Sequence, residues 1–236
     1  MEKEILIIKN ISREGPGLLE ELLKKRRIGY TIIDLALGQN FPPVENFGAV
    51  VVLGGPDSAN DNSRKMKIEL ARIREAIDAN IPYLGICLGL QTLVKAAGGR
   101  IIKSPVRETG FLDPEGSHFT TELTAAGKQD PLFEGLDHSF KVFHLHGETV
   151  ELTDSITLLS TGKFCRNQIV RVGKNAYGIQ CHFELTPEML ETWMNEDPDL
   201  LQLDKKQLKK NFAAIQDDYR LTGRKLFTNF LRIAGF

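Results

Sequence analysis

A cysteine between two glycines is the strongest candidate for chemistry in this sequence. The stretch Gly85-Ile86-Cys87-Leu88-Gly89 follows a short apolar run and precedes a helical pattern, which is the form of a nucleophile elbow. Such a turn holds its central residue in a strained conformation, and small neighbours let the chain pass close by. The helix N-terminus would favour thiolate over thiol. We therefore predict that Cys87 is a nucleophile; the alternative is a buried core cysteine in a glycine-rich turn.

A cysteine nucleophile needs a base, and the base needs a group that orients it. His182 and Glu184 lie two residues apart near the end of an apolar run, so in an extended chain their side chains point the same way. Glu184 would then hold the His182 imidazole in the useful tautomer. The alternative is an ordinary histidine at a strand end, paired with a surface acid.

The turn Gly54-Gly55-Pro56 closes another apolar run. A peptide N–H in this turn, together with the N–H of Leu88, could stabilise a tetrahedral oxyanion. A plain tight turn is the simpler interpretation. The three signals gain weight together because all of them fall at predicted strand ends.

The elements that would position these residues alternate along the first half of the chain. Apolar runs predict strands, and amphipathic segments predict helices between them. The expected strands are Glu4–Lys9, Tyr30–Leu35, Ala49–Leu53 and Pro82–Ile86, and the expected helices are Gly15–Arg27, Arg64–Ala79 and Leu88–Ala97. This order predicts an α/β fold with a doubly wound, mostly parallel sheet, whose functional crevice lies outside the carboxyl ends of the strands.

After residue 99 the pattern changes to shorter strands separated by turns, which predicts antiparallel additions to the parallel core. These strands are expected at 100–103, 119–123, 141–145, 156–160, 168–172 and 176–181. From Pro187 onwards the pattern predicts a helical C-terminal tail, with a break at Asp197-Pro198 and a cap or hinge at Gly223. No repeat or linker is evident, so we expect one domain over residues 1–236.

Composition excludes several classes of protein. The chain has 236 residues with 42% hydrophobic and 26% charged, and its formal net charge is −1, so nucleic acid and anionic membranes are unexpected partners. No apolar run is long enough for a membrane helix and the N-terminus does not resemble a targeting signal. Three cysteines argue against a disulfide framework and for a reducing compartment, so we expect a cytoplasmic protein.

Other candidates favour simpler interpretations. His144 and His146 share a strand face, but no third ligand is evident nearby, so we expect structure or substrate positioning rather than a metal site. Cys165 and Cys181 are expected to be small buried hydrophobes. Neither a phosphate-binding P-loop nor a dinucleotide fingerprint is present, and no cofactor is expected.

Three segments together resemble the class I glutamine amidotransferases of the Cys-His-Glu type. They are the stretch 82–91 around Cys87, the turn 54–56 and the triplet His182-Phe183-Glu184. The segments 142–149 and 165–168 more narrowly resemble single-domain proteins similar to the amidotransferase part of GMP synthase. Departures from the family pattern occur at Leu90, Phe183 and Glu148; the last of these could alter recognition of the substrate's amino end.

The resemblance implies a flavodoxin-like three-layer fold and a glutaminase reaction through a γ-glutamyl thioester. It assigns Cys87 as the nucleophile, His182 as the acid and base, and Glu184 as the orienting group. The implied supporting residues are Gly55 and Leu88 for the oxyanion and Gln91, Gly147 and Glu148 for the substrate.

Three functions remain open on the sequence. The first is an amidotransferase or glutaminase that hydrolyses glutamine, with a separate synthetase subunit as a possible partner. The second is a γ-glutamyl peptide hydrolase with the same triad. The third is a catalytically idle regulatory protein that kept the fold, which the complete Cys-His-Glu set disfavours.

Overall fold

The computed structural model describes residues 3–236. Its main feature is a nine-stranded sheet in the order β2-β1-β3-β4-β11-β10-β9-β6-β7. The parallel half consists of β1 (Ile5–Lys9), β2 (Tyr30–Asp34), β3 (Ala49–Val52), β4 (Tyr83–Ile86) and β11 (Ala176–Ile179). The antiparallel half consists of β10 (Ile169–Val172), β9 (Ile156–Gly162), β6 (Thr120–Leu123) and β7 (Ser139–Lys141). The predicted α/β sheet with antiparallel additions is confirmed.

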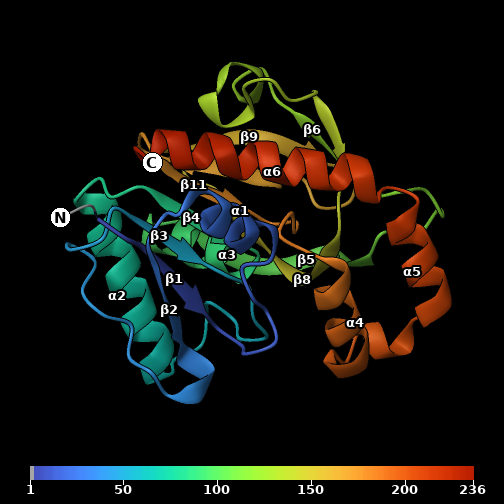
Figure 1. The fold of residues 1–236 in the computed structure, drawn as a ribbon, viewed down its shortest axis with the longest axis horizontal. Coiled ribbons are helices and arrows are strands. Elements are labelled where there is room, and N and C mark those ends of the chain that lie inside the picture. Colours follow the sequence, from blue (N-terminus) through green and yellow to red (C-terminus); the bar gives the residue numbers. More distant parts are fainter. Residues whose placement is uncertain (1–2) are drawn as a thin grey trace.

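Helices cover both faces of the sheet, which gives the three layers that the family resemblance implied (Figure 1). On one face lie α2 (Arg64–Asp78) and α3 (Leu88–Ala96), and on the other lie α1 (Leu18–Arg26) and α6 (Gln216–Ile233). Helices α4 (Pro187–Glu196) and α5 (Lys205–Ala213) lead into α6. Short 3-10 turns occupy 35–37, 127–129, 131–133 and 200–202.

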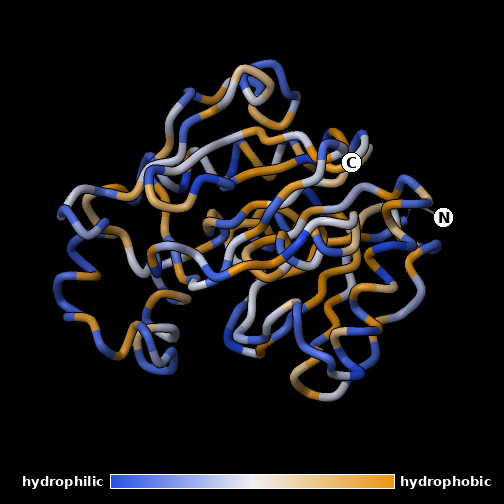
Figure 2. The backbone as a smooth tube through the Cα atoms, turned by 180° about the vertical axis from the view of Figure 1, so that it is seen from behind, coloured by the Kyte–Doolittle hydropathy of each residue, from blue (hydrophilic) through white to orange (hydrophobic). Residues whose placement is uncertain are grey.

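Alternation along the central strands explains why the sheet is buried on both sides. In β1, Ile5 and Ile7 pack into the core under α1 and α6, whereas Leu6 and Ile8 pack into the core under α2 and α3. All four side chains are fully buried. A continuous apolar run of this kind is typical of a central parallel strand, and Figure 2 shows these apolar segments gathered inside the molecule.

A second sheet of two antiparallel strands, β5 (Arg100–Gly110) and β8 (His144–Glu151), lies beside α3. The sequence predicted one strand over 141–145, but the chain leaves β7 at Lys141 and starts β8 at His144. The prediction merged two strands because Val142 and Phe143 between them are apolar and fully buried.

The C-terminal tail is helical as expected, and α4 ends at Glu196, with Asp197 as its C-cap immediately before Pro198. The prediction for Gly223 was wrong, because Gly223 lies inside α6 and is buried. A Cβ there would stand 2.5 Å from the carbonyl oxygen of Phe183, so the glycine permits close packing of α6, and the helix continues through it to Ile233. Among the helices of residues 3–236, none has the length and apolar character required to cross a membrane.

Candidate active site

Cys87 occupies a strained turn between β4 and α3. Its backbone has φ 53° and ψ −105°, a conformation that a residue with a side chain rarely adopts. The flanking glycines are required by space: a Cβ on Gly85 would lie 2.1 Å from the carbonyl oxygen of Gly89, and a Cβ on Gly89 would lie 2.1 Å from that of Val52. This is the strained strand-to-helix turn that the glycine spacing predicts.

His182 and Glu184 form a buried pair close to the end of β11. Nδ1 of His182 lies 2.6 Å from Oε1 of Glu184, and each residue is 1% exposed. The second carboxylate oxygen of Glu184 accepts a hydrogen bond from the amide of Phe183. The alternative of a surface ion pair is wrong, because both groups are enclosed.

The backbone around the pair is anchored by three other segments of the chain. The amide of His182 donates to the carbonyl of Phe143, and the Tyr219 hydroxyl of α6 donates to the carbonyl of His182 over 2.7 Å. The amide of Leu18, the first residue of α1, donates to the carbonyl of Glu184 over 2.9 Å. A pair held in this way changes its geometry little when a substrate binds.

The electrostatics of the pair favour a protonated imidazole. Burial alone would lower the pKa of His182, but the negative charge of Glu184 and the proximity of Cys87 raise this pKa well above its usual range. Nε2 of His182 is buried and makes no aligned hydrogen bond within residues 3–236. Nδ1 is thus fixed by Glu184, while Nε2 remains available for proton transfer.

The thiol of Cys87 has two polar neighbours that the sequence did not identify. Sγ lies 3.8 Å from the carbonyl oxygen of Leu145, to which the thiol can donate, and the side-chain amide of Gln180 lies 3.7 Å from Sγ as a donor.

Cys87 opens into a cavity of about 580 Å³. Most of the residues predicted for substrate or oxyanion binding line it: Gly55, Gln91, Gly147 and Glu148. Leu88, the first residue of α3, has a buried side chain, so only its backbone amide is suited to the predicted role. The cavity wall carries side chains of both charge types. The basic residues are Arg13, Lys103 and Arg107, and the acidic residues are Glu14, Asp57, Glu148, Asp197 and Asp199.

Gln91 and Glu148 are connected to each other and to the cavity wall. Nε2 of Gln91 lies 3.3 Å from the carbonyl oxygen of Glu148 and 3.4 Å from Oε1 of Gln180. The carboxylate of Glu148 accepts a hydrogen bond from the Ser58 hydroxyl over 3.0 Å. Glu148, which stands where the family pattern usually has aspartate, therefore has its carboxylate positioned by the Ser58 hydroxyl.

Glu14 is a further cavity residue that sequence reasoning missed. Its Oε2 atom is buried without a hydrogen-bond partner in the described chain. A Cβ on Gly54 would lie 2.3 Å from this oxygen and 3.4 Å from the Cβ of Cys87, so Glu14 stands beside the elbow. Burial, outweighing the positive charges of His182 and Arg13, raises the pKa of Glu14 to about 7. No spacing pattern marks this residue, because it lies in a loop far from the other site residues in sequence.

The other two cysteines are unsuited to nucleophilic chemistry. Both are buried and neither forms a disulfide. Burial raises the pKa of Cys165 to about 11 and that of Cys181 well above its usual value, so both remain thiols at neutral pH. This agrees with the expectation that they are small buried hydrophobes.

A cysteine in a strained turn beside a cavity, together with a buried histidine–glutamate pair, provides the residue types used by enzymes of covalent acyl transfer. The model of the family "Glutamine amidotransferase class-I" matches residues 18–197. The chain therefore belongs to the class I glutamine amidotransferase family, and it is an enzyme of that type.

Individual relatives agree with this assignment. The chain is 34% identical over 171 residues to the glutamine amidotransferase-like protein YfeJ of Salmonella typhimurium, with 69% of each chain covered. It is 34% identical over 140 residues to the glutamine-hydrolysing GMP synthase of Thermosipho melanesiensis, covering 58% of this chain and 24% of that enzyme. The crystal structure of a glutamine amidotransferase from Thermotoga maritima has the same fold, with a TM-score of 0.86 and 24% identity over the whole of both chains.

Proposed function

We propose that this protein hydrolyses the side-chain amide of glutamine through a thioester on Cys87, with His182 and Glu184 as its catalytic partners. The observation that carries the proposal is the 2.6 Å contact between His182 Nδ1 and Glu184 Oε1. The other ring nitrogen of His182, Nε2, is buried without an aligned hydrogen bond in the described chain. Cys87 is one of the groups that raise the pKa of His182. The elbow and the cavity support the same assignment.

In the first half-reaction, His182 Nε2 holds the proton that the thiol gives up, and the sulfur attacks the amide carbon of glutamine. Collapse of the tetrahedral intermediate breaks the C–N bond. The imidazolium then gives its proton to the leaving nitrogen, which departs as ammonia and leaves a γ-glutamyl thioester.

In the second half-reaction, water attacks the thioester carbon, and His182 takes a proton from that water. The C–S bond breaks, glutamate leaves, and the imidazolium returns its proton to the sulfur. Glu184 remains ionised throughout and stabilises the imidazolium of both steps. In each half-reaction the imidazole gives up the one proton that it takes up, so the cycle balances with glutamine and water as the only reactants.

The oxyanion of both intermediates needs hydrogen-bond donors. We assign this role to the backbone amides of Leu88 and of Gly55, which lies at the cavity wall. Leu88 is the first residue of α3, so its amide has no acceptor within the helix. Donors of this kind typically contribute a factor of about 10² to 10³ in turnover.

The cavity suits a small zwitterion. Glutamine carries one ammonium and one carboxylate, and the wall offers the carboxylate of Glu148 and the cations of Lys103 and Arg107. We propose that Gln91, Gly147 and Glu148 bind the amino-acid end of the substrate, since all three line the cavity that contains Cys87.

Two points of the function remain choices between related activities. Delivery of ammonia to a separate synthetase is proposed because a GMP synthase relative matches over 24% of its length only. A γ-glutamyl peptide hydrolase would use the same triad.

We further propose that residues 1–236 act as one amidotransferase domain, since α6, which lies beyond the family match, packs against α1.

The test is ammonia or amine release by the pure protein from glutamine and from a panel of γ-glutamyl peptides, with Cys87→Ala as the blank. We expect glutamine to be hydrolysed and the blank to be inactive. Faster release from a γ-glutamyl peptide than from glutamine would favour the peptide hydrolase, and absence of turnover on every substrate would favour the idle regulatory protein.

A further inference from the structure

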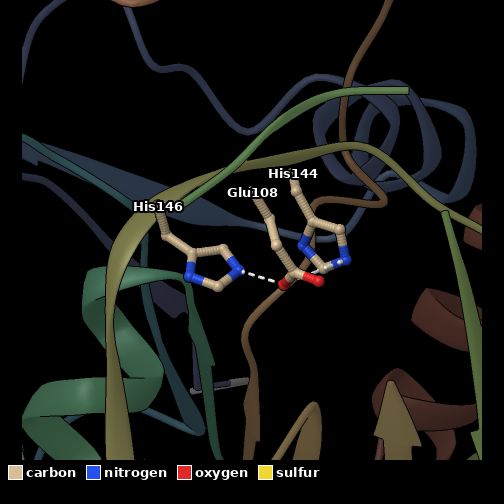
Figure 3. A group of neighbouring side chains, drawn as sticks. All are labelled: Glu108, His144 and His146. Atoms are coloured by element: carbon tan, nitrogen blue, oxygen red, sulfur yellow. Dashed lines mark ion pairs between the residues drawn. The ribbon is translucent and has the colours of Figure 1, made fainter. Parts of the chain in front are cut away.

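Three buried side chains meet at the edge of the cavity, separate from Cys87, His182 and Glu184. They are Glu108 of β5 and His144 and His146 of β8 (Figure 3). The sequence expectation that no third ligand accompanies the two histidines is wrong, because the antiparallel register of β5 and β8 places Glu108 directly opposite His146. The third group was invisible in the sequence since it lies far upstream in the chain.

The distances within the group are those of a nearly formed metal site. Oε2 of Glu108 lies 2.9 Å from Nε2 of His146 and 3.7 Å from Nε2 of His144. The three candidate ligand atoms all lie within 4.8 Å of one another. Ligands at about 2.0–2.2 Å from a tetrahedral Zn²⁺ are separated by roughly 3.3–3.6 Å, so small side-chain movements would complete the geometry.

A neutral His146 beside an ionised Glu108 does not account for the closest contact. Nδ1 of His146 lies 3.0 Å from the carbonyl oxygen of Glu148, and because a carbonyl only accepts, Nδ1 must carry the hydrogen. In a neutral His146 ring, Nε2 then presents a lone pair to the carboxylate oxygen of Glu108. That nitrogen makes no aligned hydrogen bond within residues 3–236. Two facing lone pairs require a cation between them, either a proton or a metal ion.

The surroundings of the group resemble the outer shell of a metal site. The ring N–H of His146 is fixed on a backbone carbonyl, and the side-chain amide of Gln168 donates to Oε2 of Glu108 over 3.3 Å. Partners of this kind orient ligating histidines and carboxylates. The three side chains are 1–5% exposed, and His146 reaches the cavity that contains Cys87, which provides a path for an ion and a water ligand.

We propose that Glu108, His144 and His146 bind one divalent metal ion of the zinc type. Two imidazoles and one carboxylate form a ligand set that suits Zn²⁺ and leaves a fourth position for water. The ion would tie β5 to β8, the strand that also carries Leu145 beside the Cys87 thiol and Glu148 in the cavity wall. It would thus fix the shape of the substrate cavity, a role independent of which γ-glutamyl compound is hydrolysed.

The experiment is a titration of metal-free Cys87→Ser protein with Co²⁺ and Zn²⁺, followed by visible absorption and calorimetry. The serine variant removes the catalytic thiolate as a competing ligand. We expect one equivalent to bind, with cobalt bands of nitrogen and oxygen ligation and no sulfur charge-transfer band. Glu108→Gln and His146→Gln in the same background should weaken binding by at least 10- to 100-fold. His138→Gln, which changes an exposed histidine elsewhere, should bind like the parent.

Equal affinity in the parent and in Glu108→Gln, or no binding by the parent, would overturn the proposal and leave a proton as the shared cation. If the variants fail to fold, X-ray absorption of the zinc-loaded parent decides without them. Two imidazoles with nitrogen and oxygen at about 2.0–2.1 Å support the site, whereas a sulfur ligand would place the ion on another cysteine and overturn it.

Discussion

Nδ1 of His182 lies 2.6 Å from Oε1 of Glu184, and both groups are buried against α1 and α6. This contact gives the imidazole its orientation and raises its pKa. We predict that His182→Ala lowers turnover by at least about 10²-fold, as expected for lost acid–base catalysis. Glu184→Gln should cost less, since it keeps the shape and loses the charge. Steady-state ammonia release measures both, and wild-type activity in Glu184→Ala would remove Glu184 from the site.

The second prediction concerns the choice of nucleophile. A glutamine-directed electrophile should label Cys87 alone in the folded protein, because burial keeps Cys165 and Cys181 protonated and only Cys87 lines the cavity. Peptide mapping after labelling checks this. Cys165→Ala and Cys181→Ala serve as matched controls and should be labelled to the same extent as the wild type. Labelling of Cys165 or Cys181 in the wild-type protein would refute the assignment.

The third prediction tests the space at the elbow. Gly89→Ala places a Cβ 2.1 Å from the Val52 carbonyl, so β3 and α3 must separate, at a cost of about 1–3 kcal/mol in the free energy of unfolding. Gly15→Ala is the control, since no atom lies within 4 Å of its Cβ. Denaturant unfolding of both variants decides; equal stability would mean that the elbow is not closely packed.

The fourth prediction follows from Glu14. Its pKa is about 7 when folded, against 4.5 as the ordinary value, so the folded state holds this proton more tightly. The contribution of Glu14 to stability therefore falls as pH rises from about 4.5 to 7 and stays low above it. Glu14→Gln mimics the neutral acid and should be more stable than wild type at pH 8, by up to roughly 3 kcal/mol, with little difference at pH 4.

Comparison of the two unfolding free energies across this pH range is the measurement. Glu69, whose pKa burial also raises to about 7, is present in both proteins and cancels. A difference between wild type and Glu14→Gln that does not change with pH would show that Glu14 is ionised at the same pH in the folded and unfolded states.

The sequence predicted the parts of the site that depend on local pattern. The glycines around Cys87 are required by contacts within a few residues or with the adjacent strand, and His182 and Glu184 are neighbours in sequence. Glu14 and Glu108 could not be found in this way, because only the folded chain brings the loop before α1 to the elbow and the middle of β5 to β8. Gly223 was misjudged for the same reason, since its role is a contact with Phe183 from a distant segment.

The central claim is that glutamine is hydrolysed through a thioester on Cys87. The most direct measurement is acid quenching of the protein during turnover with glutamine, followed by mass spectrometry of the peptide that contains Cys87. The account predicts a γ-glutamyl adduct on Cys87 that disappears with hydroxylamine, and no ammonia release from Cys87→Ala. Ammonia release that persists in Cys87→Ala, without an adduct on Cys87 in the wild type, would contradict it.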